Sequence, residues 1–193
     1  GYREVIAARL EAGDVGENEA AERLAAALAA PLTRRSRAAT GRVNMAAESA
    51  GLFTVDAGRI DRLNTAHESL TVGTLPNFTP VAPRDIVATI KVVPFSVPGA
   101  ILADVEGIAR DGPPAFRIHP FRPLRAGLVL TELPGLKESV AENTIAATSA
   151  RVAGLTGALL PPLRCPHAES PIAKCLELLL SQGADLVMVA GAS

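Results

Sequence analysis

The sequence predicts an α/β protein with two parts: a mixed α+β region over residues 1–122 and a parallel, three-layer β-α-β-α-β unit over residues 123–193. Three observations support this prediction. Of the 193 residues, 48% are hydrophobic and 20% are charged, which is enough apolar material for packed cores. Beyond residue 125, strand-like apolar runs alternate with helical periodicity, a pattern typical of parallel strands joined by helices. Two prolines within residues 120–123 favour an extended linker between the parts.

The N-terminal region is expected to open with a short strand over residues 5–10. Asp14 followed by Glu17 has the spacing of a capping box, which predicts that a helix begins there. The alanine-rich helix that follows should end before Pro31, because proline cannot continue a helix. Its apolar face is predicted to carry Ala20, Leu24 and Leu28.

Short elements alternate through the rest of this region. A short helix is expected over residues 43–50 and a strand over residues 52–55. Asp56 is a good N-cap for another helix, whose apolar residues Ile60 and Leu63 have helical spacing. Further strands are expected over residues 70–75, 86–93 and 116–119, and a further helix over residues 99–110.

The C-terminal unit is predicted to begin with a buried strand over residues 126–131, followed by a helix over residues 140–155. The inward residues of this helix are predicted to be Ile145, Val152 and Leu155.

A second strand is expected over residues 158–163, and its two prolines place it at the edge of the sheet because they cannot donate ladder hydrogen bonds. Pro171 is favourable in the first turn of the next helix, which Gly183 should end. The third strand is expected over residues 185–190.

Ligands of open parallel sheets bind beyond the carboxyl ends of the strands, where the strand order reverses. If the first strand lies between the other two, the crevice falls between the loops that follow the first and third strands. The first loop offers Gly135 for close backbone approach, Lys137 for charge, and Ser139 near a helix N-terminus that attracts anions. The other loop, residues 191–193, has only small side chains. Both loops favour a phosphorylated ligand.

The order and spacing of three segments resemble a known family. These segments are residues 124–135 (LRAGLVLTELPG), 142–158 (ENTIAATSARVAGLTGA) and 183–193 (GADLVMVAGAS). They are similar to the molybdopterin-binding domain of the MoaB/Mog and MoeA-like proteins of molybdenum cofactor biosynthesis. Residues 4–21 and 87–95 look like the region that precedes this domain in bacterial proteins described as molybdopterin-binding. The resemblance implies a Mog-like, Rossmann-like fold for residues 123–193.

The resemblance also implies a function: binding of molybdopterin or its nucleotide derivative, with activation of the pterin by adenylylation or insertion of molybdate. In a full-length protein, this chemistry would use Mg²⁺ and ATP or CTP. Asn143 occupies the place of an Asn in the family's helix start. No catalytic residue is assigned. The residues implied in cofactor binding are Thr131, Glu132, Gly135, Lys137, Ser139, Asn143, Gly191, Ala192 and Ser193.

Two departures from the family keep other functions open. Ala192 follows Gly191 where the family has paired glycines, which favours a non-catalytic scaffold or sensory module. The acidic residue assigned to the family's metal-dependent chemistry would lie beyond Ser193, so the chain is expected to be a truncated part of a longer protein. A generic nucleotide-binding domain is the third alternative; it would bind ATP without any preference for a pterin.

Composition argues against several other classes. The net charge is −1, aromatic residues make up 3% of the chain, and tryptophan is absent, which argues against nucleic-acid binding. No apolar run approaches the roughly 20 residues needed to cross a membrane. Cys165 and Cys175 lie among helix and strand signals, which suggests a reducing cytoplasm. Cys165 and His167 lack further ligands at suitable spacing, so no metal site is predicted.

Two surface features complete the sequence-based predictions. Three arginines cluster at Arg34, Arg35 and Arg37 and are interpreted as a solvated loop. A three-stranded parallel sheet with two helices leaves its edges uncovered, which predicts a homo-oligomer. The expected partners are thus a small pterin ligand, which the family resemblance implies, and further copies of the chain.

Overall fold

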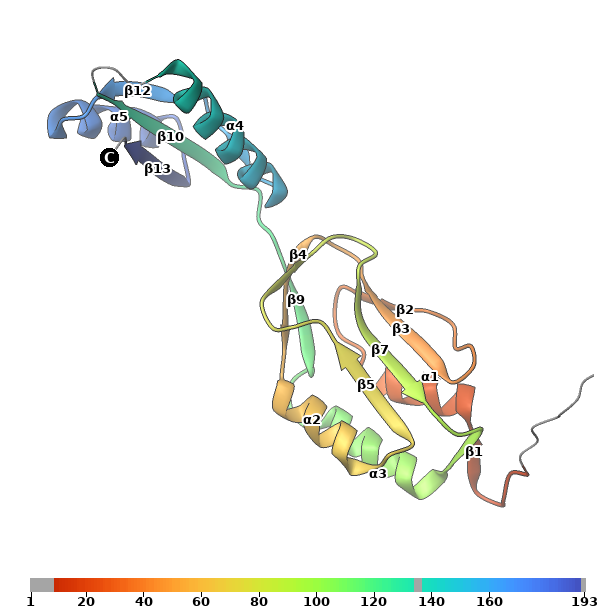
Figure 1. Ribbon diagram of the computed structural model, residues 1–193. Helices are drawn as coiled ribbons and strands as arrows, with labels where there is room; N and C mark the ends of the chain where they lie inside the picture. The colour runs from red at the N-terminus through yellow and green to blue at the C-terminus, as the bar shows by residue number, and fades with distance from the viewer. Residues whose placement is uncertain (1–8, 134–136, 192–193) are drawn as a thin grey trace, which may run out of the picture. The chain divides into compact units, whose positions relative to one another are not determined.

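A computed structural model describes residues 9–133 and 137–191 of the chain. The chain forms two compact units, Gly1–Pro120 and Phe121–Ser193, each with hydrophobic clusters of its own (Figure 1). The sequence places the division two residues further along, after residue 122. None of the helices in the described residues is both long and apolar enough to span a bilayer.

The main sheet of the first unit is antiparallel and contains, in spatial order, β2 (Thr33–Arg35), β3 (Arg42–Ala47), β7 (Ile86–Val92) and β5 (Leu70–Thr74) (Figure 1). Along β3, buried residues alternate with more exposed ones. This period of two is typical of a half-buried strand and not of a helix. The helix predicted over residues 43–50 is therefore wrong.

Three helices share one core with this sheet: α1 (Glu17–Ala27), α2 (Ala57–Ala66) and α3 (Gly99–Arg110). Helix α1 packs against β3 and β7, while α2 packs against β5 and α3. Asp56 caps α2 as predicted, since its carboxylate accepts a hydrogen bond from the Arg59 N–H at 3.1 Å. The predicted burial of Ala20, Leu24 and Leu28 on the α1 side is confirmed.

Two smaller sets of strands complete the first unit. One is an antiparallel sheet of β6 (Thr79–Val81), β4 (Gly51–Val55) and β9 (Phe116–Pro120), and the other pairs β1 (Asp14–Gly16) with β8 (Ser96–Pro98). Strand β6 lies in the loop between the strands expected at 70–75 and 86–93 and was not predicted. The other strands expected between residues 52 and 119, and the helix over residues 99–110, are confirmed within one residue.

The start of the chain departs from the sequence-based prediction. Asp14 belongs to β1 and does not cap α1. The N-cap residue of α1 is Gly16, with no side-chain hydrogen bond to the first turn. The Asp14 carboxylate instead accepts hydrogen bonds from the Glu11 N–H and the Ser96 hydroxyl. The strand predicted over residues 5–10 lies mostly outside the described residues, and residues 9 and 10 form no strand.

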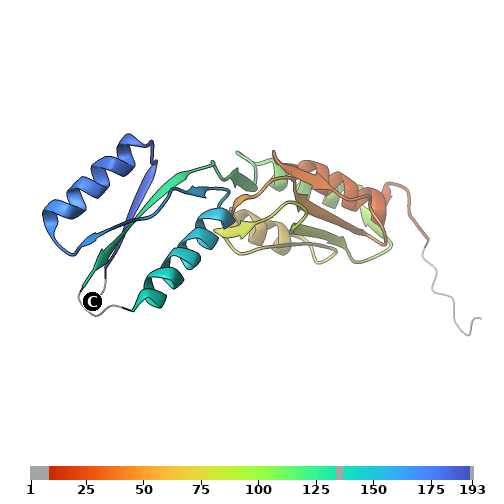
Figure 2. The ribbon, with the colours of Figure 1, turned by 90° about the horizontal axis from the view of Figure 1, so that it is seen from above.

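The second unit is a parallel sheet with a helix on each face (Figure 2). Its central strand, β10 (Arg125–Glu132), pairs with all the others. On one side it pairs with β11 (Ala158–Leu159) and β12 (Leu163–Pro166), and on the other with β13 (Leu186–Gly191). The predicted alternation of strands and helices is confirmed, and the first strand lies between the other two, which is the arrangement on which the predicted crevice depends. The two helices are α4 (Glu138–Gly154) and α5 (Glu169–Ser181).

Both faces of β10 are buried. Leu128 and Leu130 belong to one hydrophobic cluster with Ala141 of α4. Val129, whose side chain points the other way, belongs to a second cluster with Leu179 of α5. A central parallel strand is expected to be continuously apolar for this reason.

Two details of the second unit differ from the predictions. The strand expected over residues 158–163 is split, because Pro161 and Pro162 cannot donate ladder hydrogen bonds. The pairing with β10 also slips by one residue between β11 and β12. Leu155, predicted to point inward, is the C-cap residue of α4 and is 46% exposed. The chain leaves the helix there, since Thr156 adopts a φ of +61°.

Candidate ligand-binding site

The candidate site lies at the carboxyl end of β10. There Thr131 pairs with Cys165 on β12 and with Gly191 on β13. The chain leaves β10 toward α4 on one face and enters β13 from α5 on the other. This is the point of an open parallel sheet at which the strand order reverses and ligands bind.

Thr131 is buried and engaged in hydrogen bonds. Its side chain is 2% exposed, and Oγ1 lies 2.8 Å from Nδ1 of His167. The same hydroxyl lies 3.5 Å from the carbonyl oxygen of Ala190 on β13. Thr131 therefore fixes the imidazole of His167, which follows β12 at the same edge of the sheet. A buried hydroxyl held in this way forms part of the wall of the site and positions its neighbour.

Gly191 is required by this contact. A Cβ on Gly191 would lie 2.9 Å from Oγ1 of Thr131 and 3.3 Å from Cε1 of His167. A Cβ distance below 3.0 Å means that one of the groups would have to shift, so glycine fits beside the Thr131–His167 pair without displacing it. The sequence predicts that a ligand approaches the backbone at Gly191. In the structure, the side chains of Thr131 and His167 lie close to the Gly191 backbone.

Ion pairs connect the first turn of α4 to β12. The guanidinium of Arg164 forms a two-pronged ion pair with Glu138, with one N···O distance of 2.8 Å, and lies 3.4 Å from Glu132. Hydrogen bonds from Arg164 lower the pKa of Glu138. The negative charge of Glu138 is also well placed at the positive end of the helix dipole. Glu132, predicted to contact a ligand, is instead paired with Arg164.

The N-terminus of α4 carries the remaining predicted cation. Lys137 is the N-cap residue of α4. Its side chain is exposed and makes no capping hydrogen bond with the first turn. Ser139 is exposed in that first turn. The two negative charges of Glu132 and Glu138 are balanced by the two positive charges of Arg164 and Lys137, so the formal charge of these four residues is zero. The first-turn N–H groups and the ammonium of Lys137 are the groups here that suit an anion.

A small pocket of about 50 Å³ lies at this corner, between the carboxyl ends of β10 and β13 and the start of α4. Its lining includes Thr131, Glu132, Val140, Thr144 and Gly191. One buried water needs about 10–15 Å³ of such space, so the pocket can take a small terminal group of a ligand.

The structure thus brings together part of the predicted set. Thr131, Glu132 and Gly191 line the pocket. Lys137 and Ser139 belong to the adjoining helix start, while Asn143 lies one turn further along and is not part of the lining. Three predicted residues lie outside the described residues: Gly135, Ala192 and Ser193.

Two site residues were missed by sequence reasoning, His167 and Arg164. Their contacts join residues that are 36 and 26 positions apart in the sequence. The sequence offered one indication of these residues: Arg164 lies within β12 and His167 follows it directly, so both lie near the carboxyl end of a parallel strand. Side chains at the carboxyl ends of parallel strands meet at one edge of the sheet.

The cysteines and acidic residues show no metal-binding arrangement. Within the described ranges, there is no cluster of three or more His, Cys, Asp or Glu side chains suited to a metal ion. Cys165 and Cys175 are free thiols. Burial, and to a lesser degree a hydrogen bond with Cys175, raises the pKa of the Cys165 thiol, so it stays protonated at neutral pH and is a poor nucleophile.

No protein-family model matches the sequence, and no curated protein matches it.

Proposed function

We propose that the second unit binds molybdopterin or its nucleotide derivative, with a phosphate group at the carboxyl end of β10. One observation carries this proposal: the strand order reverses at Thr131, beside a pocket that Gly191 borders and the start of α4 adjoins. Two of the three segments that resemble the molybdopterin-binding family, residues 124–135 and 183–193, run along β10 and β13 toward this end of the sheet, and the third segment, residues 142–158, begins within α4.

Each residue has a defined role in this proposal. The Lys137 ammonium neutralises the phosphate, and the first-turn N–H groups of α4 and the Ser139 hydroxyl donate hydrogen bonds to it. Glu138 would repel an anion, but its charge is balanced by Arg164. Gly191 borders the pocket on the β13 side.

The proposal is limited to binding. By the family resemblance, adenylylation of the pterin or insertion of molybdate would use Mg²⁺, and adenylylation would also consume a nucleotide. The described residues contain no acidic cluster for a metal ion. The groups at the carboxyl end of β10 can bind and orient a phosphate, and either reaction would need additional groups.

Titration with three ligands distinguishes this proposal from the generic nucleotide-binding alternative. The whole chain is titrated with molybdopterin, with its adenylylated form and with ATP. The proposal predicts that both pterins bind more tightly than ATP. Equal affinity for all three would favour a generic nucleotide-binding domain, and absence of pterin binding would refute the proposal.

A further inference from the structure

The outer strand of the main sheet in the first unit carries an unusual concentration of positive charge. Residues 33–42 contain four arginines and no acidic residue. Arg34 and Arg35 lie within β2, and Arg37 follows it closely. All three arginines are exposed, as predicted, but Arg34 and Arg35 lie in a strand at the edge of the sheet and not in a loop.

Hydrogen bonds show which backbone groups of this edge face outward. The Glu48 N–H donates to the carbonyl of Leu32 at 2.9 Å, and the Ser36 N–H donates to the carbonyl of Asn44 at 2.8 Å. In an antiparallel pair, alternate residues point their backbone groups toward the partner strand. Leu32, Arg34 and Ser36 therefore face β3. The N–H and C=O of Arg35 point to the free edge, where another strand can pair.

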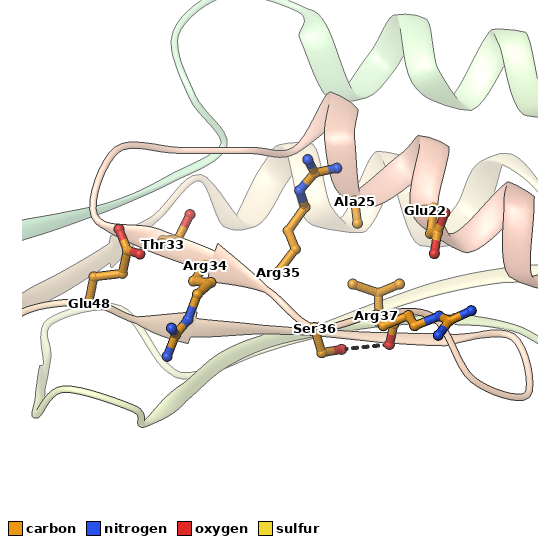
Figure 3. A pocket seen from close by; sticks show the side chains of 9 residues that line it. Glu22, Ala25, Thr33, Arg34, Arg35, Ser36, Arg37 and Glu48 are labelled. Atoms are coloured by element: carbon orange, nitrogen blue, oxygen red, sulfur yellow. Dashed lines mark hydrogen bonds between the residues drawn. The ribbon is translucent and has the colours of Figure 1, made fainter.

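A hollow of about 540 Å³ runs beside this edge, between β2 and α1 (Figure 3). Figure 3 shows Glu48 near Thr33 at one end and Glu22 near Arg37 at the other. At the second end the Glu22 carboxylate accepts a hydrogen bond from the Ala38 N–H at 3.3 Å. The two acidic residues thus lie at the ends of the hollow, and the arginines of β2 lie between them.

The arginines diverge instead of converging. Arg35 pairs with Met45, which is buried on the helix-covered face of the sheet, whereas Arg34 pairs with Ala46 and points to the opposite face. Figure 3 shows Arg35 directed toward α1 and Arg34 directed away from it. Within the described residues, Arg34, Arg35 and Arg37 form no ion pair. One compact anion cannot reach all three guanidinium groups, but side chains on both faces of an added strand can.

We propose that this edge of β2 binds an extended acidic segment of a partner protein, which adds a strand to the sheet. Backbone hydrogen bonds to Arg35 would hold the segment, and its carboxylates would face Arg34 on one face and Arg35 and Arg37 on the other. The hollow beside α1 would take the side chains on the helix side. Charge excludes a second copy of this edge, because antiparallel self-pairing would bring like charges together.

A defined peptide tests the proposal in the whole chain. The probe is a fluorescein-labelled peptide, Thr-Glu-Glu-Val-Glu-Thr with a blocked C-terminus, and its binding is followed by fluorescence anisotropy. A control peptide has the same sequence with N-methyl groups on alternate amides, which keeps every charge but removes the donors needed for strand pairing. Slower hydrogen exchange over residues 33–37 with the first peptide reports on the backbone directly.

Matched variants test the arginines. The double variant Arg34→Gln/Arg35→Gln should bind the peptide about 2- to 30-fold more weakly, since each opposite-charge pair across strands contributes modestly. Arg9→Gln/Arg117→Gln changes the net charge equally at exposed sites elsewhere in this unit and should leave affinity unchanged. Circular dichroism confirms that both variants fold.

Three outcomes would overturn the proposal. Equal binding of the N-methylated peptide would mean that only charge attracts the probe. Displacement of the peptide by an equal concentration of pyrophosphate would identify a site for compact anions. Absence of binding up to roughly 1 mM peptide would rule out even a weak specific interaction. All three outcomes are read from the wild-type chain, so they do not depend on any variant.

Discussion

Thr131 and His167 are joined by a 2.8 Å hydrogen bond between Oγ1 and Nδ1 at the carboxyl end of the parallel sheet, and Gly191 leaves no room for a side chain beside them. The contact links the ends of β10 and β12 and borders β13. The corner at which a phosphate is proposed to bind is thus fixed by groups that are 36 positions apart in the sequence.

Replacement of Gly191 by alanine should destabilise the second unit. The new methyl group would lie 2.9 Å from Oγ1 of Thr131, and overpacking of this kind costs about 1–3 kcal/mol. Gly154 provides a control, because a Cβ there meets nothing within 4 Å. Gly154→Ala should be neutral or stabilise by up to about 1 kcal/mol. Urea denaturation followed by circular dichroism compares the two, and equal midpoints would show that the site accommodates the methyl group.

Loss of the Thr131 hydroxyl should release His167. Thr131→Val keeps the shape of the side chain but removes the partner of Nδ1, which should lower the free energy of unfolding by about 0.5–1.5 kcal/mol. Nitrogen chemical shifts of the His167 ring, measured by NMR, should change toward those of a solvated imidazole. Unchanged shifts would mean that another group holds the ring.

The buried carboxylate of Glu106 should make the first unit sensitive to acid. Hydrogen bonds from Arg23, at 2.9 Å and 3.2 Å, lower the pKa of Glu106, and Arg110 adds a weaker contact. Because the pKa is lower in the folded state, this stabilisation is present above the ordinary Glu value of about 4.3 and is lost as the pH falls through the folded-state pKa.

Glu106→Gln should therefore cost about 1.5–3 kcal/mol at pH 7, the range for hydrogen bonds to charged groups. The difference from the wild type should shrink as the pH falls below about 4. Asp104→Asn, on the exposed side of the same helix, should have little effect at either pH. A constant difference between wild type and Glu106→Gln at all pH values would contradict the role of the charge.

Self-association remains a prediction, and the outer strand β13 is where we expect it. Leu186 and Val189 on this strand are about half exposed, as is Leu180 on α5. Val189→Lys should reduce association because a charged edge resists pairing. Sedimentation velocity measures the oligomeric state, and a monomeric wild-type chain at high concentration would contradict the expectation.

Elements with strong local signals were predictable from the sequence. Helix α3 follows from apolar residues at helical spacing, and α2 follows from the cap supplied by Asp56. The segment 43–50 was misjudged because Met and Ala favour helices, whereas pairing with β2 and β7 decides its structure. Asp14 and Glu17 have the spacing of a capping box, but Asp14 lies in β1, which pairs with β8.

The candidate site was predictable in its position and not in its contacts. Alternating strands and helices place the ends of the first and third strands together, which is confirmed by the pairing of Thr131 with Gly191. The ion pair of Arg164 with Glu138 and the bond of His167 with Thr131 join side chains on different elements. Such contacts depend on strand register, which local sequence does not determine.

The most direct test of the proposed function is the affinity of the Lys137→Ala variant for molybdopterin. Lys174→Ala is the matched control, since Lys174 is an exposed lysine of the same unit on α5. Loss of one charged contact to a phosphate costs about 1.5–3 kcal/mol, which corresponds to a roughly 10- to 100-fold rise in Kd. We predict this rise for Lys137→Ala and an unchanged Kd for Lys174→Ala, in titrations of the whole chain with the same ligand. Equal affinities of the two variants would remove Lys137 from the site, and failure of the wild-type chain to bind molybdopterin would contradict the proposed function itself.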